Sequence, residues 1–78
     1  MKNRIREFRE LLRLTQEQLG TLVGVSRQAI NAVETEKFEP SIWLAYDLCM
    51  VFEQPMEDVF LFGESERKSR AQKRGGAA

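Results

Sequence analysis

The chain of 78 residues contains no histidine and only one cysteine, and these shortages exclude several kinds of chemistry. Without histidine there is no zinc site of the Cys/His type and no imidazole general base. The lone Cys49 excludes an internal disulfide and suggests a reducing compartment, which we expect to be the cytoplasm. No glycine-rich phosphate loop is present, and no serine or cysteine has a suitable base nearby in the sequence. We therefore expect no enzymatic activity, no metal and no cofactor.

Long hydrophobic runs are also missing. No apolar stretch approaches the roughly 20 residues that a membrane span needs, and the mixed-charge residues 1–7 lack the apolar segment of a signal peptide. The composition, 42% hydrophobic and 31% charged, is that of a globular domain. The length allows one domain with a modest core, to which a partner subunit would add stability. We expect no association with membranes.

The net charge is zero, but the charges are unevenly distributed along the chain. Residues 1–31 carry six basic and three acidic side chains, residues 32–64 carry one basic and eight acidic, and residues 65–78 carry five basic and one acidic. A basic N-terminal half beside an acidic half gives an electrostatic field that suits a protein whose basic side approaches phosphates.

Hydrophobic spacing and capping residues predict five helices. They cover residues 3–13, 16–23, 26–34, 41–52 and 55–60. Thr15 and Gln18 fit a capping box, and Ser26 and Ser41 are good N-caps. Gly24 stands where the second helix must end, because glycine adopts a left-handed backbone at little cost. The chain therefore reads as an all-α domain with a helix-turn-helix unit at about residues 15–34.

The inward positions of these helices define the predicted core. It comprises Ile5, Phe8, Leu12, Leu19, Leu22, Val23, Ala29, Ile30, Val33, Ile42, Ala45, Leu48, Cys49 and Phe52. The apolar residues 61–63 could finish the last helix or form a short strand. We expect the domain to end at residue 63, and residues 64–78 to form a polar, basic tail that is either a solvated terminus or a nonspecific DNA arm.

The helix-turn-helix stretch carries a family resemblance. The matching residues are Thr15-Gln16-Glu17-Gln18-Leu19, Val23-Gly24-Val25-Ser26-Arg27-Gln28, Ile30-Asn31 and Pro40-Ser41. They resemble the Cro/phage-repressor family of helix-turn-helix regulators, also called the xenobiotic-response-element family, and above all its small stand-alone members. The resemblance covers about residues 5–60. It implies a five-helix, Cro/repressor-like DNA-binding domain with a short C-terminal apolar extension.

The resemblance also implies a function and roles for individual residues. The chain would regulate transcription, as a repressor, by reading the major groove of double-stranded DNA with helix 26–34. The DNA-binding residues would be Gln16, Ser26, Arg27, Gln28, Asn31 and Lys37. Arg9 and Glu34 would form a partly buried, structural ion pair between the first and third helices.

Two kinds of departure from the family pattern stand out. The family has glycine where this chain has Arg13 and Glu36, so either these residues carry a positive φ at a cost of about 1 kcal/mol or the loops follow another path. Glu36 and Glu39 also place acid beside Lys37.

Three residues at helical spacing, Trp43, Tyr46 and Met50, form an apolar face separate from the core stripe of the fourth helix. We expect a homodimer through this face, with Leu61 and Phe62 joining it. Two alternatives are that the tail covers the face, or that the chain is an antitoxin-like or other protein-interaction module that binds a partner protein there.

Overall fold

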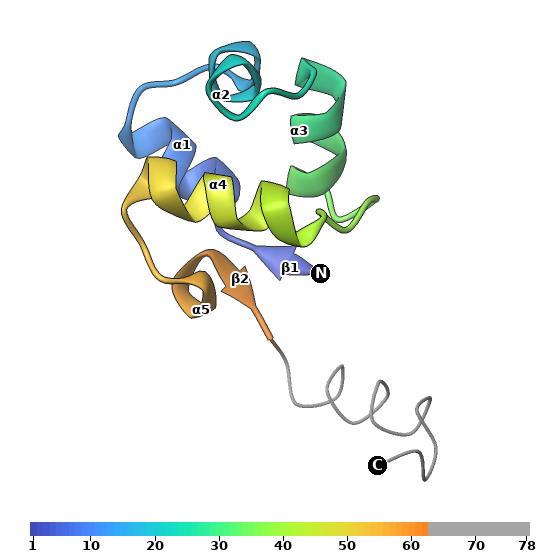
Figure 1. Cartoon of the computed structure of the whole chain (residues 1–78), viewed down its shortest axis with the longest axis vertical. Coiled ribbons are helices and arrows are strands. Elements are labelled where there is room, and N and C mark those ends of the chain that lie inside the picture. Colours follow the sequence, from blue (N-terminus) through green and yellow to red (C-terminus); the bar gives the residue numbers. More distant parts are fainter. Residues whose placement is uncertain (63–78) are drawn as a thin grey trace, which may run out of the picture.

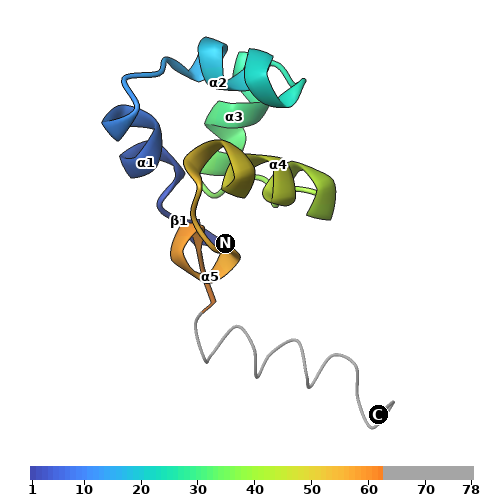
Figure 2. The same ribbon diagram turned by 60° about the vertical axis from the view of Figure 1, so that its left-hand side comes forward.

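The computed structural model describes residues 1–62. The elements in chain order are β1 (Lys2–Asn3), α1 (Ile5–Leu11), α2 (Gln16–Val23), α3 (Arg27–Glu34), α4 (Ile42–Phe52), α5 (Met56–Val59) and β2 (Phe60–Leu61). Figures 1 and 2 show α2 and α3 together at one end of the molecule, with β1, β2 and α5 at the other end and α1 and α4 between them. The prediction of a five-helix domain with a helix-turn-helix unit is confirmed. The tail predicted for residues 64–78 lies outside the described residues.

Hydroxyl caps fix where three of the helices begin, as predicted. Thr15 Oγ1 accepts from the Gln18 backbone N–H at 3.0 Å, and Gln18 Oε1 accepts from the Thr15 N–H at 2.8 Å, which completes the capping box. Ser26 and Ser41 cap α3 and α4 in the same way, each at 3.1 Å. Gly24 has φ 75° at the end of α2. Each of these signals acts within a few residues of the helix end that it sets.

The first helix is shorter than the predicted range 3–13, because the chain before it is a strand. β1 pairs with β2 in antiparallel register, with Lys2 opposite Leu61 and Asn3 opposite Phe60. The side chain of Asn3 extends this contact to α3, since its Nδ2 donates to the Val33 carbonyl at 2.9 Å. Of the two readings left open for residues 61–63, the structure takes the strand for Leu61. The five helices therefore come with a two-stranded sheet that joins the two ends of the described chain.

In the described part of the chain, ten side chains form the buried core. They are Ile5, Leu19, Ile30, Val33, Leu44, Ala45, Leu48, Phe52, Val59 and Phe60. At the margin, the rings of Phe8 and Phe52 lie 5.7 Å apart between centroids. Seven of these ten were predicted from the sequence. The pattern did not single out Leu44, Val59 and Phe60. Val59 and Phe60 are buried at the junction of α5 and β2.

Three predicted core residues are wrong, because Leu12, Leu22 and Ile42 are all exposed. Leu12 follows the end of α1 and so leaves the helical register of Ile5. Leu22 lies about 60° around α2 from Leu19, given 100° of rotation per residue, and its side chain is 59% exposed. Ile42 is the first residue of α4. It lies next to the exposed loop before the helix, where its side chain does not reach the core.

Among residues 1–62, three residues other than glycine have a left-handed backbone: Arg13 (φ 57°), Glu36 (φ 64°) and Glu53 (φ 54°). Arg13 and Glu36 therefore keep the backbone that the family provides with glycine, and the loops do not take another path. Glu53 ends α4 in the same conformation. Such residues cost stability, since the side chain crowds the backbone in this region. Within residues 1–62, no helix is long and apolar enough to cross a membrane.

Candidate nucleic-acid interface

The interface is built on α2, the turn at Gly24 and α3. The Val25 N–H donates to the Gly20 carbonyl at 2.9 Å and closes the turn against α2. The chain passes very near α2 here, because a Cβ added to Gly20 would lie 2.5 Å from the Val25 carbonyl oxygen. Leu19 of α2 and Ile30 of α3 are buried in the core beneath the turn. This packing fixes the direction in which α3 presents its other side.

That other side of α3 is polar and exposed. Arg27, Gln28 and Asn31 lie on it, opposite the buried Ile30 and Val33. Together with Gln16 at the start of α2, these three polar residues line a hollow of about 250 Å³. The structure therefore brings together four of the six predicted DNA-binding residues.

Within residues 1–62, Arg27 and Gln28 have no hydrogen-bond or ion-pair partner for their side chains. They stand in the first turn of α3. Five N–H donors on Arg27, and both donors and an acceptor on Gln28, are thus available to a ligand that approaches this end of the helix.

Ser26 and Lys37 lie outside the hollow. The Ser26 hydroxyl accepts from the Ala29 N–H as the cap of α3, which leaves its O–H free to donate. Lys37 is exposed in the loop beyond the C-terminal end of α3, where its backbone N–H donates to the Ala32 carbonyl at 2.9 Å. Lys37 thus lies beyond the opposite end of α3 from Arg27 and Gln28.

Arg9 and Glu34 form an ion pair beneath the interface. Arg9 Nε lies 2.7 Å from Glu34 Oε2 and Arg9 Nη2 lies 3.2 Å from Glu34 Oε1, a two-pronged contact. The side chains are only 12% and 4% exposed. Arg9 Nη1 also donates to the Leu14 carbonyl at 2.8 Å, and the hydrogen bond to Glu34 raises the pKa of Arg9 above its usual value. The pair joins α1 to the end of α3 and, through Leu14, to the start of α2.

One connection was not expected from the sequence. Gln16 Nε2 donates to Asn31 Oδ1 at 3.1 Å and to Glu34 Oε1 at 3.3 Å. Glu34 was predicted to be purely structural, yet it contacts a residue of the hollow. No periodic signal indicates this contact, because Gln16 and Glu34 lie 18 positions apart on different helices.

Known proteins resemble this chain in both sequence and fold. The family model for helix-turn-helix proteins matches residues 5–59. An HTH-type transcriptional regulator of Archaeoglobus fulgidus is 46% identical over 66 residues, which cover 85% of this chain and 93% of the relative. The HTH-type transcriptional regulator YgzD of Bacillus subtilis is 44% identical over 64 residues, which cover 82% of this chain and 97% of YgzD.

A solved structure gives a third comparison. The P22 c2 repressor, in complex with a synthetic operator, matches with a TM-score of 0.67 and 33% sequence identity, over 69% of this chain and 82% of the repressor chain. The likeness therefore extends over most of both chains. Together these matches show that the chain belongs to the Cro/phage-repressor type of helix-turn-helix family, whose members are DNA-binding transcriptional regulators.

Proposed function

We propose that this protein binds a specific sequence of double-stranded DNA with α3, that it does so as a homodimer, and that it represses transcription in the cytoplasm by blocking access of RNA polymerase. The observation that carries the proposal is the hollow lined by Gln16, Arg27, Gln28 and Asn31. An α-helix fits into the major groove of B-DNA, where base edges are exposed. The P22 c2 repressor, which has a similar fold, was solved with a synthetic operator.

Arg27 and Gln28 are the residues that we expect to read bases. They open α3, and the N-terminal residues of a recognition helix reach the base edges first. The guanidinium of Arg27 suits guanine, with acceptors at O6 and N7, whereas the amide of Gln28 suits adenine, with a donor at N6 and an acceptor at N7. Asn31 lies one turn further along the same side of α3.

Contacts to phosphate would hold α3 in register. The first turn of α2, beginning at Gln16, offers backbone N–H groups that no carbonyl of the helix accepts. The Ser26 hydroxyl and the Lys37 ammonium supply further donors on either side of α3. Glu36 and Glu39 flank Lys37 and oppose the approach of a phosphate, so we expect Lys37 to contribute less than an isolated lysine would.

Selection of bound sequences from a random duplex library, at moderate salt, tests the proposal. We expect an enriched palindrome with half-sites about 34 Å apart, which is one turn of B-DNA. Binding that is weak, salt-sensitive and equal for all sequences would contradict sequence-specific recognition. Transcription from a promoter that carries the enriched site, with and without the protein, then tests repression.

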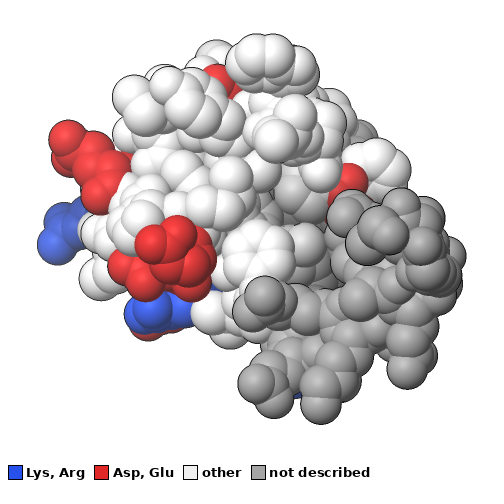
Figure 3. Space-filling view, turned by 60° about the horizontal axis from the view of Figure 1, so that its bottom comes forward, with Lys and Arg blue, Asp and Glu red and all other residues white. Residues whose placement is uncertain are grey.

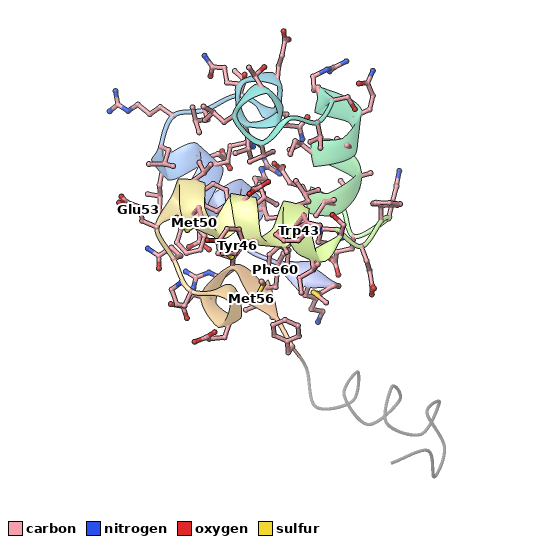
Figure 4. All side chains as sticks on the ribbon, in the orientation of Figure 1. Trp43, Tyr46, Met50, Glu53, Met56 and Phe60 are labelled. Atoms are coloured by element: carbon pink, nitrogen blue, oxygen red, sulfur yellow. The ribbon has the colours of Figure 1, made fainter. Side chains whose placement is uncertain are left out.

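The proposed dimer interface lies on α4. Trp43 is 75% exposed, Met50 is 60% exposed and Tyr46 lies between them. Figure 4 shows these three side chains along α4, above Met56 of α5. Figure 3, viewed from the side of α5, shows a broad uncharged surface with most of the visible charged groups gathered on the left. An exposed apolar surface of this kind is typical of an interface.

The shape of this face favours a second copy of the chain as its partner. Next to Met50, a pocket of about 420 Å³ opens between α4 and α5. Its lining comprises Tyr46, Cys49, Met50, Glu53, Gln54, Pro55 and Met56. If two α4 helices crossed antiparallel near Tyr46, Trp43 of each copy would reach the pocket of the other. A two-fold interface requires self-complementarity of this kind. We place the exposed Leu61 and Phe62 at its margin.

Sedimentation equilibrium tests the dimer. We expect a dimer at tens of micromolar, a monomer for Trp43→Ala, and a dimer for the control Leu11→Ala, which removes an equally exposed apolar side chain from α1. A monomeric wild type would contradict the homodimer. A monomer that copurifies with a second protein chain bound through Trp43 would instead support the antitoxin-like alternative.

A further inference from the structure

The carboxylate of Glu34 is the centre of a hydrogen-bond chain that begins at the partly buried Arg9 of α1 and ends at Asn31 on the exposed side of α3. Its Oε2 accepts from Arg9 Nε at 2.7 Å. Its Oε1 accepts from Arg9 Nη2 at 3.2 Å and from Gln16 Nε2 at 3.3 Å. Because Glu34 is only 4% exposed and is held by Arg9 on both oxygens, it has little freedom to reorient.

The charge of Glu34 determines which end of each neighbouring amide points inward. An ionised carboxylate can only accept hydrogen bonds, so Gln16 must turn its amide nitrogen toward Glu34. The same nitrogen donates to Asn31 at 3.1 Å, and Asn31 must therefore turn its oxygen inward. The Asn31 nitrogen, which carries only donors, is then left on the exposed side of α3.

We propose that Glu34 and Gln16 set the hydrogen-bond polarity of Asn31, so that Asn31 presents donors to the DNA. Asn31 then prefers a base edge made of acceptors, the O6 and N7 of guanine, over the N4 amino group of cytosine. Gln16 and Glu34 act here as positioning residues that need not touch a base. This inference rests on the proposed function, because it assigns the base preference of one position in the same interface.

The chain also provides a suitable variant for testing this role. Both amide hydrogens of Gln16 are engaged within the protein, so a phosphate at α2 is left to the backbone N–H groups. Gln16→Met has a side chain of similar length that cannot donate, and it leaves that backbone intact. It removes the link between Glu34 and Asn31, which frees the Asn31 amide to present either end.

The experiment compares the sequence preferences of the wild type, Asn31→Ala and Gln16→Met on one randomised duplex library. Asn31→Ala identifies the base pair that Asn31 reads. At that pair we expect the wild type to prefer guanine over cytosine on the order of tenfold, and Gln16→Met to retain about threefold or less. We expect the preferences at the other base pairs to be unchanged, and Gln16→Met/Asn31→Ala to match Asn31→Ala alone.

Glu34→Gln provides a second test, after circular dichroism has established that the variant is folded. Its amide can turn either end toward Gln16, so we expect the same loss of preference at the same base pair. If Gln16→Met binds all sequences more weakly but keeps the wild-type preference profile, the inference is wrong, since a merely structural role would produce that result. A wild type that enriches no sequence at all would overturn the proposed function and this inference with it.

Discussion

Arg27 and Lys37 are both exposed cations near α3, yet we expect their removal to affect DNA binding differently. Arg27→Ala should weaken binding to the selected site by about 1–3 kcal/mol and relax the preference at one base pair. Lys37→Ala should weaken binding to every sequence alike. It should also lower the slope of log K against log salt concentration by about one, the value for one lost phosphate contact. Fluorescence anisotropy with single-substituted duplexes at several salt concentrations measures both effects. An equal loss on all sequences for Arg27→Ala would make Arg27 a phosphate contact.

We expect the ion pair of Arg9 and Glu34 to stabilise the folded domain. Arg9→Met should lower the free energy of unfolding by about 3–5 kcal/mol, because it leaves the carboxylate of Glu34 buried without its partner. The matched control is Arg6→Met, which breaks the exposed pair with Glu10 and should change stability little. Urea denaturation of both variants measures the difference. Similar losses for the two would mean that burial does not distinguish the pairs.

The left-handed backbone of Arg13 predicts an unusual gain in stability. Arg13→Gly should raise the free energy of unfolding by about 0.5–1 kcal/mol, because glycine relieves the crowding at φ 57° by more than its greater freedom in the unfolded chain costs. Arg13→Ala is the control, since it removes the guanidinium and keeps the Cβ. Thermal denaturation compares the three proteins, and a gain for alanine equal to that for glycine would assign the effect to charge.

At the scale of elements, the sequence predicts what is decided locally. The start of α2 follows from Thr15 and Gln18, and the start of α3 from Ser26, because each capping hydrogen bond spans only three residues. The outward position of Arg27 and Gln28 follows from the periodicity of α3. The strand β1 could not be predicted, because its partner β2 lies almost 60 residues away along the chain. The bond from Gln16 to Glu34 was missed for the same reason.

The reactivity of Cys49 offers a test of the α4 face, which is the proposed dimer interface formed by Trp43, Tyr46 and Met50. Burial, with a smaller contribution from Glu57, raises the pKa of the Cys49 thiol. We therefore expect slow alkylation by iodoacetamide at neutral pH, with a rate that rises at higher pH, because the thiolate is the reactive form. Because Cys49 also lines the pocket beside Met50, its alkylation should slow as protein concentration rises and the dimer forms. The chain unfolded in urea is the control. Protection that does not depend on concentration would argue against this interface.

At the scale of the whole molecule, the fold places its two proposed surfaces on different parts of the chain. The four residues that line the hollow all lie within residues 1–31, the basic segment, whereas the α4 face belongs to the acidic segment 32–64. In the proposed arrangement, DNA meets the basic part of the chain, and the acidic part is left to contact a second copy. We expect this separation of charge to steer α3 toward DNA. The electrostatic attraction should weaken at high salt, since ions screen charges over about 8–10 Å.

The pairing of β1 with β2 also decides when the fold can be completed. A ribosome makes Lys2 and Asn3 before the five described helices, but their partners Phe60 and Leu61 only after them. The helix-turn-helix unit can form beforehand, because its contacts are short in sequence, whereas the sheet must await nearly all of the domain. Until then the core lacks Val59 and Phe60, which are buried in it in the complete fold. A nascent chain that stalls before residue 59 thus holds α3 on an unfinished core, and we expect it to be a ready substrate for proteases.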